Sequence, residues 1–350
     1  MKQFRVGILG ATGSVGQRFI QLLADHPWFT ITEVVASGRS AGKPYHEAVS
    51  WKMPTGIPQS VRDLVVKPAE PNLDCDFVFS GLDSSVAGPI EAAFAQAGYP
   101  VISNSKNHRM DPLVPLLIAD INPGHIEMIP YQQKEKGYNK GFIVTNPNCS
   151  TIGLVMALKP IHDAFGIKRA IVSTMQAISG AGFPGVPSMD ILENVVPYIG
   201  GEEDKIENEP GKILGHLKDN AFITEPMQIS ASCNRVPVFD GHLESASIEL
   251  RDKATIGEVS EAIQRYRSEA HELALPSAPE QVVVVRQEPD RPQPRLDRDC
   301  NRGMSAVVGR IRECPVFDIR FSVLSHNTIR GAAGVAILNA ELLVTKGYIT

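Results

Sequence analysis

The segment Asn146-Pro147-Asn148-Cys149 places a thiol where a reactive cysteine is expected. Residues 141–145 are apolar and predict a short strand, and the Asn-Pro-Asn sequence predicts a turn, because the residue before a proline avoids helical dihedrals. Residues 151–165 carry apolar side chains at helical spacing. Cys149 is therefore expected near a helix N-terminus, where unpaired N–H groups favour the thiolate and lower the pKa of the thiol. We interpret Cys149 as a nucleophile, with a buried core cysteine as the alternative.

Further along the chain lie side chains that a cysteine nucleophile needs. Arg235 closes a strand-like run, and His242 follows it after a turn that contains proline and glycine. Arginine is a bidentate clamp for carboxylate or phosphate, and a histidine beside a thiol is its natural base. Gln176 ends another apolar run and opens a glycine-rich segment, so its amide could orient a carbonyl group or a water molecule. The alternatives are a structural histidine and a strand-end glutamine in a flexible loop.

A glycine-rich turn near the N-terminus predicts a dinucleotide site. Gly10, Gly13 and Gly16 lie between an apolar strand at 5–9 and an apolar-periodic helix at 14–24. Glycines at these positions let the backbone approach a pyrophosphate, which the helix N-terminus then holds. We expect Gly10, Thr12, Gly13, Ser14, Val15 and Gly16 to bind the cofactor. A tight strand–helix turn without a ligand is the alternative.

The end of the second strand, at 31–36, indicates which dinucleotide binds. An NAD site has an acidic residue there for the ribose 2′-hydroxyl, but this chain has no carboxylate until Glu47, and Glu33 lies too early. Ser37, Arg39 and Ser40 could instead hold a 2′-phosphate. The sequence therefore favours NADP, with a solvated loop arginine as the alternative.

Two charged segments allow more than one interpretation. Lys106 and Arg109 could bind an anion near a domain boundary, or form an ordinary basic pair on the surface. Residues 200–209 are rich in Glu and Asp, and on composition alone they predict only a solvated acidic helix start.

The order of the expected elements predicts two domains. Strands at 76–80 and 99–103 and a helix at 88–97 continue the alternation begun at 5–36, which is typical of an α/β fold with a Rossmann-type doubly wound parallel sheet. Strand-like runs at 170–175, 227–235, 244–250, 281–285 and 317–323 predict an α+β domain with a mixed or antiparallel sheet. We expect a nucleotide-binding domain over 1–148, completed by a helix within 327–350, and a second domain over 149–326. Residues 290–302 predict a surface loop.

Composition excludes several classes of partner. The chain has 350 residues and a net charge of −5, with both signs interspersed, which argues against nucleic-acid binding. No run approaches the ~18 apolar residues of a membrane span, and the first residues pass directly into a strand, with no room for a leader peptide. The five cysteines are odd in number without a Cys-x-x-Cys pair, and no histidine spacing suggests a metal site. A reducing cytoplasm is the expected compartment.

Taken together, these motifs resemble the aspartate-semialdehyde dehydrogenase family, in the branch found in fungi and archaea, and the resemblance runs essentially end to end. It rests on Gly10-Ala-Thr-Gly-Ser-Val-Gly16, Asn146-Pro-Asn-Cys-Ser-Thr151, Gln176-Ala-Ile-Ser-Gly-Ala-Gly182, Asn234-Arg-Val-Pro-Val-Phe-Asp-Gly-His242 and His326-Asn-Thr-Ile-Arg-Gly-Ala-Ala-Gly334. Each motif alone is weakly specific, whereas the combination is highly specific.

The resemblance implies a role for each matching position. Cys149 would be the nucleophile, His242 the acid/base, and Gln176 the residue that orients the thioacyl intermediate. Substrate contacts would come from Arg235 on the α-carboxylate, Glu202 on the amine, Lys205 and Arg109 on phosphate, and Asn148 of the Asn-Cys motif. A one-residue slip from Glu202 to Glu203 is open. Ser179 and Gly180 would bind the cofactor, and Asn327 would line the nicotinamide side.

The resemblance also implies a reaction. It is the NADP-dependent reductive dephosphorylation of 4-phospho-L-aspartate to L-aspartate 4-semialdehyde through a thioester on Cys149, in the biosynthesis of lysine, methionine, threonine and isoleucine. The active species would be a homodimer or homotetramer assembled through a catalytic and dimerisation domain. The alternatives are a reductase of N-acetylglutamyl phosphate and, more remotely, a non-catalytic NADP-binding regulator.

Overall fold

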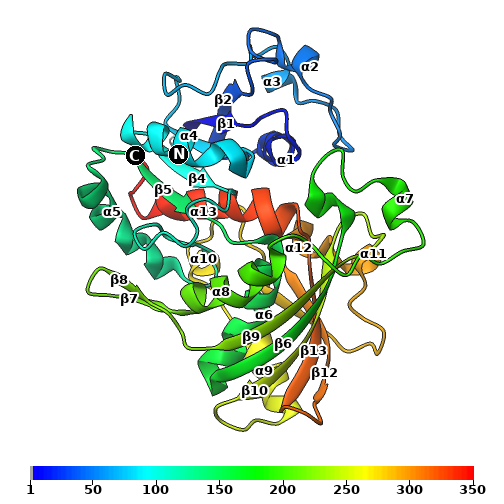
Figure 1. Ribbon diagram of the computed structural model, residues 1–350. Helices are drawn as coiled ribbons and strands as arrows, with labels where there is room; N and C mark the ends of the chain where they lie inside the picture. The colour runs from blue at the N-terminus through cyan, green and yellow to red at the C-terminus, as the bar shows by residue number, and fades with distance from the viewer. Residues whose placement is uncertain (1–2) are drawn as a thin grey trace.

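Strand β1 (Phe4–Leu9) lies inside a five-stranded parallel sheet, in a computed structural model that describes residues 3–350 (Figure 1). The strand order is β2-β1-β3-β4-β5, so the chain reverses its direction of travel between β1 and β3. Ligands of such sheets bind beyond the carboxyl ends of the strands at this switch point. The other strands are β2 (Phe29–Val35), β3 (Phe77–Ser80), β4 (Pro100–Ser103) and β5 (Phe142–Thr145).

Helices cover both faces of this sheet, which confirms the predicted doubly wound architecture. Helices α1 (Ser14–Leu23) and α13 (Gly334–Thr345) pack in one apolar core with β1, and α4 (Ser84–Gln96) packs in another with β3 and β4. Helix α4 begins at 84 rather than at the predicted 88, because the Asp83 carboxylate caps it by accepting from the Ser85 N–H. The shorter helices of this part are α2 (Tyr45–Ala48), α3 (Gln59–Arg62), η1 (Pro123–Met128) and α5 (Ile129–Lys136).

A six-stranded mixed sheet carries the second core. Its order is β11-β12-β13-β10-β6-β9, with parallel pairs at β6/β9 and β11/β12 and antiparallel pairs elsewhere. The predicted mixed sheet is confirmed, but β12 was not among the predicted strands. The strands are β6 (Ile167–Gln176), β9 (Gln228–Arg235), β10 (His242–Leu250), β11 (Val283–Arg286), β12 (Ala306–Glu313) and β13 (Ile319–Ser325).

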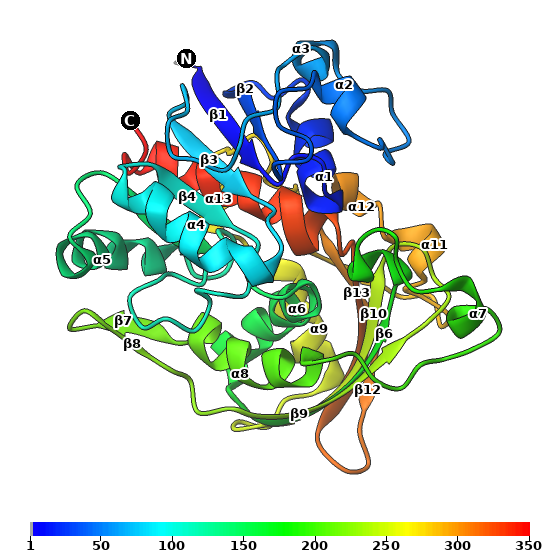
Figure 2. The same ribbon diagram turned by 45° about the horizontal axis from the view of Figure 1, so that its top comes forward.

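One face of the mixed sheet is covered by α6 (Cys149–Phe165) and α9 (Ile256–Arg265), while α8 (Glu202–Leu214) packs against β9 (Figure 2). Helix α6 follows β5 of the parallel sheet in the chain and packs on the mixed sheet. It therefore connects the two sheets. The smaller elements here are η2 (Ile178–Ala181), α7 (Ser188–Ile191), β7 (His216–Lys218), β8 (Ala221–Ile223), α10 (Glu269–Glu272), α11 (Pro294–Asp297), α12 (Cys300–Gly303) and the π-helix η3 (Ile329–Ala333).

The expected surface loop at 290–302 is more structured than its composition suggests. It contains α11 and α12, and the Asp297 carboxylate is 1% exposed. Arg286 Nε and Arg291 Nε donate to that carboxylate at 3.2 and 2.6 Å, as does the Gln293 N–H at 2.7 Å. The sequence prediction was wrong because a buried carboxylate with these partners orders the segment from inside.

Within residues 3–350, no helix is both long enough and apolar enough to cross a membrane. The same residues hold no group of three or more His, Cys, Asp or Glu side chains that could bind a metal ion. All five cysteines are free.

Candidate active site

A cavity of about 750 Å³ lies between the two cores and joins the nucleotide turn to Cys149. Most of the predicted site residues line it. They are Thr12, Gly13, Ser14, Val15, Arg109, Asn148, Cys149, Gln176, Ser179, Gly180, Glu202, Lys205, Arg235 and Asn327. Gly10, Gly16 and His242 are not lining residues, and neither are Ser37, Arg39 and Ser40.

Cys149 is the first residue of α6, as predicted from the strand, turn and helix around it. The Asn148 side chain caps the helix, since its Oδ1 accepts from the N–H groups of Ser150 and Thr151 at 3.0 and 3.3 Å. A methyl group on Gly331 would come within 2.8 Å of Cys149 Cβ, so η3 holds the cysteine from the opposite side. The sulfur is therefore fixed by one helix start and one close backbone contact.

The expected lowering of the thiol pKa was wrong. Burial, with the Glu202 carboxylate as the next cause, raises the pKa of the Cys149 thiol to about 12. Arg109, Arg235 and Lys205 act in the opposite direction without overcoming burial. The helix N-terminus is present, but a desolvated sulfur next to a carboxylate favours the neutral thiol.

His242 meets the thiol as the sequence predicted. Its Nε2 lies 3.3 Å from Cys149 Sγ, and its Nδ1 accepts a hydrogen bond of 3.0 Å from the Ala177 N–H. The ring is fully buried at the start of β10. Burial, with Arg235 as the next cause, lowers the pKa of His242 to about 3, so the imidazole is neutral.

Gln176 and Arg235 stand beside His242 because neighbouring strands end together. Gln176 pairs with Arg235 across the parallel strands β6 and β9, and β10 is the other neighbour of β6. Arg235 Nη1 donates to the Ala177 carbonyl at 2.8 Å, and Gln176 Nε2 donates to Thr174 Oγ1 at 3.3 Å. The sheet register thus brings the three predicted residues side by side, and two of them, Gln176 and Arg235, line the cavity.

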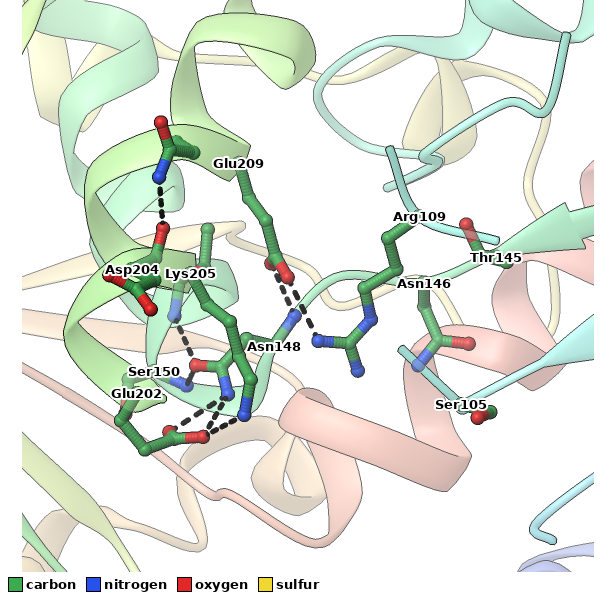
Figure 3. Close-up of polar contacts among 12 residues, drawn as sticks. Ser105, Arg109, Thr145, Asn146, Asn148, Ser150, Glu202, Asp204, Lys205 and Glu209 are labelled. Atoms are coloured by element: carbon green, nitrogen blue, oxygen red, sulfur yellow. Dashed lines mark hydrogen bonds and ion pairs between the residues drawn. The ribbon is translucent and has the colours of Figure 1, made fainter. Parts of the chain in front are cut away.

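A network of ion pairs ties the cationic residues to the start of α6 (Figure 3). Arg109 Nη1 donates to Glu209 Oε1 at 2.9 Å, and Glu209 Oε2 accepts from the Asn148 N–H at 2.7 Å. Asn148 Nδ2 donates to both Glu202 carboxylate oxygens at 3.1 and 2.9 Å, and Lys205 pairs with the same carboxylate. One carboxylate therefore connects Arg109 to the backbone directly before the nucleophile.

This network corrects two interpretations made from composition. Arg109 is buried and ion-paired rather than part of a basic surface pair, and Glu202 and Glu209 are buried rather than solvated. Glu202 lines the cavity, whereas Glu203 Oε1 accepts from the Cys233 N–H at 3.0 Å on β9. The geometry therefore favours Glu202 over Glu203 as the residue that faces a ligand.

Sequence reasoning missed Glu209 and Lys212. Lys212 Nζ is buried and donates to the carbonyls of Arg109, Asp111 and Val114 at 2.8 Å each, which fixes the loop that carries Arg109. The sequence did contain a signal for their burial. Glu209 and Lys212 lie at helical spacing from Ile206 and Ile213, which are buried on the same face of α8. Charged residues that share a face with buried isoleucines are expected to be buried too.

The nucleotide turn has the close contacts that require glycine. Gly10 has φ +78°, and a Cβ on it would lie 2.7 Å from the Gly81 carbonyl oxygen at the end of β3. A Cβ on Gly16 would lie 2.2 Å from the Gly10 carbonyl oxygen. The turn is therefore compact and brings the N-terminus of α1 to the switch point of the sheet, where a pyrophosphate fits.

At the end of β2 the structure bears on the choice of dinucleotide. Glu33 is buried and engaged, since its carboxylate accepts from Lys67 Nζ at 2.8 Å and from the Asp74 N–H at 3.0 Å. Ser37 and Arg39 are exposed beyond the strand end. The Glu33 carboxylate is thus already hydrogen-bonded within the protein and does not face a ribose. The loop after β2 instead carries the Arg39 guanidinium and the hydroxyl groups of Ser37 and Ser40.

Asn327 links the two sides of the cavity. Its Nδ2 donates to Ser179 Oγ at 2.8 Å, and its Oδ1 accepts from the Gly241 N–H at 2.8 Å. The predicted cofactor-binding residues Ser179 and Asn327 are therefore in direct contact, next to the turn that carries His242.

Family models match both parts of the chain. One described as semialdehyde dehydrogenase, NAD binding domain, matches residues 5–129, and one described as semialdehyde dehydrogenase, dimerisation domain, matches residues 158–330. Aspartate-semialdehyde dehydrogenase from Aspergillus fumigatus is 51% identical over 356 residues, covering 99% of this chain and 98% of that protein. The chain belongs to the aspartate-semialdehyde dehydrogenase family.

Other relatives agree with the predicted branch. The enzyme of that name from Methanothermobacter thermautotrophicus is 53% identical over 342 residues, covering 97% of this chain and 98% of that protein. The crystal structure of aspartate semialdehyde dehydrogenase with NADP from Candida albicans aligns with a TM-score of 0.92 and 47% identity, covering 99% of this chain and 100% of that one. The family likeness thus extends over both cores and the cavity between them.

Proposed function

We propose that the chain catalyses the NADP-dependent reductive dephosphorylation of 4-phospho-L-aspartate to L-aspartate 4-semialdehyde. The observation that carries the proposal is the Cys149–His242 contact of 3.3 Å beside a cavity that is also lined by Arg109, Lys205, Arg235 and the nucleotide turn. A thiol that attacks an acyl phosphate needs these groups to hold the phosphate and the oxyanion. The reaction serves the aspartate-derived amino acids lysine, methionine, threonine and isoleucine.

The predicted catalytic and substrate-binding residues each have a part in this scheme. Arg235 binds the α-carboxylate of the substrate, and Glu202 binds its ammonium group. Arg109 and Lys205 hold the phosphate while Cys149 Sγ attacks the acyl carbon. Gln176 and Asn148 hold the acyl oxygen near the helix start. His242 acts on the sulfur and the oxyanion from Nε2.

The nucleotide turn fits the dinucleotide that this reaction uses. Gly10, Thr12, Gly13, Ser14, Val15 and Gly16 would hold its pyrophosphate, Ser37, Arg39 and Ser40 its 2′-phosphate, and Ser179, Gly180 and Asn327 its nicotinamide half. When bound, the dinucleotide supplies the hydride that reduces the thioester. The support for NADP over NAD is the engaged Glu33 and the exposed Arg39.

The test is NADPH oxidation with 4-phospho-L-aspartate, compared with N-acetylglutamyl phosphate as substrate. We expect turnover with the first and little with the second, because Arg235 and Glu202 suit a free amino acid. Cys149→Ala should abolish turnover and leave NADPH binding nearly unchanged. Retention of turnover in that variant would exclude the thioester, and a preference for N-acetylglutamyl phosphate would favour the alternative reductase. A wild-type protein that binds NADPH but turns over neither substrate would favour the regulator.

We also propose the larger organisation of the molecule. Residues 1–148 with 327–350 form the nucleotide-binding domain, and 149–326 form the catalytic and dimerisation domain, because α13 shares a core with β1 and α6 shares a core with the mixed sheet. A homodimer or homotetramer, assembled through the second domain, would cover the exposed apolar residues Met189, Leu192, Val195 and Tyr198. The free thiols are consistent with a cytoplasmic enzyme. Analytical ultracentrifugation of wild type and Met189→Ser tests the interface, since an unchanged assembly would exclude this face.

A further inference from the structure

Glu91 of α4 is a fully buried carboxyl group that the reaction scheme does not use. Its Oε1 accepts from Ser80 Oγ at 2.6 Å and from Ser103 Oγ at 2.7 Å. These serines are the last residues of β3 and β4, and they pair with each other across the parallel sheet. Since burial of a carboxyl group costs free energy that an apolar side chain avoids, its presence here indicates a role other than stability.

Ser103 extends this contact to the loop that follows β4. A serine hydroxyl has one proton, and that of Ser103 points to Glu91. The lone pairs of Ser103 Oγ are therefore free to accept, and the Ser105 N–H donates to them at 2.9 Å. Without the carboxyl group the hydroxyl could rotate its proton toward this amide. Glu91 therefore holds Ser103 in the orientation that accepts from the loop.

The loop held in this way lies beside the phosphate side of the cavity. Its residues Asn104, Ser105, Lys106 and Arg109 all line that cavity. The Asn104 carbonyl accepts from Arg109 Nη2 at 2.9 Å, while Glu209 accepts from Nη1, also at 2.9 Å. Arg109 is therefore oriented from two sides, by α8 of the second core and by the loop that follows β4.

The other carboxyl oxygen of Glu91 faces the far end of the same loop. Oε2 lies 3.6 Å from His108 Nε2, and within residues 3–350 neither atom has a hydrogen-bond partner. Next to it, Asn107 Nδ2 donates at 3.0 Å to the carbonyl of Ser84, the first residue of α4. Helix α4 thus supports the loop at its beginning, through Ser103, and at its end, through Asn107 and His108.

We propose that Glu91 is a positioning residue for the phosphate group of the substrate. It is buried away from the cavity and acts through Ser103 and the loop at 104–109 on the place of Arg109. The inference rests on the proposed function, which assigns the phosphate to Arg109. An arginine that is already held in place loses less conformational entropy when it binds an anion, so the loop bonds strengthen phosphate binding.

A matched pair of serine variants tests the path through the loop. Ser103→Ala and Ser80→Ala each remove one buried hydroxyl that Glu91 binds, but of the two, within residues 3–350, only Ser103 Oγ also accepts from a loop amide. We expect KM for 4-phospho-L-aspartate and Kd for inorganic phosphate to rise about five- to tenfold in Ser103→Ala and less than about twofold in Ser80→Ala. The kcat should change less than about threefold in both. Equal phosphate binding in the two variants would overturn the proposal.

Glu91 itself is tested by a pair that separates hydrogen bonding from packing. Burial raises the pKa of Glu91 to about 7, so Glu91→Gln resembles its neutral form and keeps an oxygen that accepts from both serines. Glu91→Leu fills the space without an acceptor. We expect the leucine variant to lose phosphate affinity as Ser103→Ala does, and the glutamine variant to stay within about twofold of wild type. Glu135→Gln, on the exposed side of α5, is the control.

The dissociation constant of NADPH distinguishes positioning from general loosening. It should stay unchanged in every variant, because the nucleotide turn belongs to β1 and α1. An equal loss of NADPH and phosphate affinity would overturn the proposal, as would wild-type phosphate binding in Glu91→Leu. If that variant does not fold, the serine pair decides alone.

Titration with inorganic phosphate, followed by calorimetry, separates this inference from the proposed function. A wild type that binds phosphate but does not oxidise NADPH with 4-phospho-L-aspartate would reject the function, while the serine pair would still decide the role of Glu91. A wild type that binds no phosphate would overturn the inference.

Discussion

Cys149 is subject to two opposing electrostatic influences. The start of α6 and the cations Arg109, Lys205 and Arg235 favour the thiolate, whereas desolvation and Glu202 favour the thiol. Burial is the largest of these, so the free enzyme keeps its nucleophile protonated.

Alkylation measures this balance directly. Because the pKa of Cys149 is raised to about 12, its reaction with iodoacetamide should accelerate by about tenfold per pH unit from pH 7 to beyond pH 9. Peptide mapping by mass spectrometry separates it from Cys314, whose pKa is lowered by backbone hydrogen bonds from Phe317 and Val316 and which should react at lower pH. A plateau for Cys149 below pH 8 would show that the helix terminus dominates after all.

Glu244 is a second residue whose charge state opposes its ordinary behaviour. It is fully buried two residues after His242, and burial together with Glu202 raises its pKa well above 4.5. An unfolded chain releases this proton near the ordinary value, while the folded one retains it. Stability is therefore full below the unfolded pKa and is lost as the pH rises toward the folded one.

Glu244→Gln should remove that pH dependence, because the amide is neutral at every pH. We expect the melting temperature of the variant, relative to wild type, to increase steadily between pH 5 and 8. Differential scanning calorimetry at several pH values provides the measurement, with Glu249→Gln as the control because Glu249 is on the same strand, has a lowered pKa and is not buried. A constant difference across the range would mean that Glu244 is ionised in the folded protein.

Among the elements, α8 has the most unusual construction. Its inward face carries Glu202, Glu209 and Lys212 together with Ile206 and Ile213, so one helix contributes both to the second core and to the ion pairs of the cavity. Since Glu209 joins Arg109 to the Asn148 backbone, α8 sets the distance between the phosphate-side arginine and the start of α6.

Glu209→Gln should loosen this connection while keeping the helix. The loss of a buried charge opposite Arg109 costs stability, by about 1–3 kcal/mol if the amide keeps one hydrogen bond. We expect KM for the acyl phosphate to rise more than kcat falls, because Arg109 is freed rather than removed. Asp204→Asn, on the exposed face of the same helix, is the matched control for steady-state kinetics and urea unfolding. Identical kinetics for the two variants would exclude Glu209 from the site.

At the scale of the whole molecule, buried polar residues join the two cores. Arg330 of η3 pairs with Asp120 at 2.6 Å with both side chains fully buried, and Ser268 Oγ donates to the same carboxylate at 2.6 Å. Asn339 of α13 accepts from the Ala119 N–H and donates to the Leu117 carbonyl, both at 2.9 Å. Helices η3 and α13 thus hold the segment before η1, whose apolar residues alternate between the two cores.

Asp120→Asn should destabilise the protein by about 3–5 kcal/mol, because it leaves the Arg330 charge buried without its partner. Combining it with Arg330→Met should restore part of the loss, since the double variant buries no charge. Chemical unfolding followed by tryptophan fluorescence and by far-UV circular dichroism checks both expectations. If the double variant were no better than the single one, the pair would contribute through packing alone.

The sequence predicts local structure and chemistry much better than it predicts contacts. The turn at Gly10, the helix start at Cys149 and the pairing of His242 with the thiol depend on short motifs, and the structure confirms their geometry. Strand β12 was missed because Gly309 and Arg310 interrupt its apolar pattern. Arg310 has φ +57°, and the pairing with β13 shifts register between Gly309 and Arg312. Glu209 and the thiol pKa were missed because both depend on burial by segments about 60 residues away.

The carboxylates around Cys149 have a consequence for how substrate arrives. Arg109, Lys205 and Arg235 together carry three positive charges, and Glu202 and Glu209 cancel two of them, so one net charge acts close to the sulfur. Lys52, Lys106 and Asp83 also line the cavity and add one more positive charge, so the cavity as a whole is cationic. The carboxylates beside Cys149 weaken the cavity's long-range attraction on a dianion, whereas an uncompensated cationic cleft can raise association rates by about 10–10³. Recognition beside the sulfur is therefore short-ranged and geometric, while Lys52 and Lys106 leave a modest attraction at the cavity. The enzyme's kcat/KM should fall only moderately as the salt concentration of its surroundings rises.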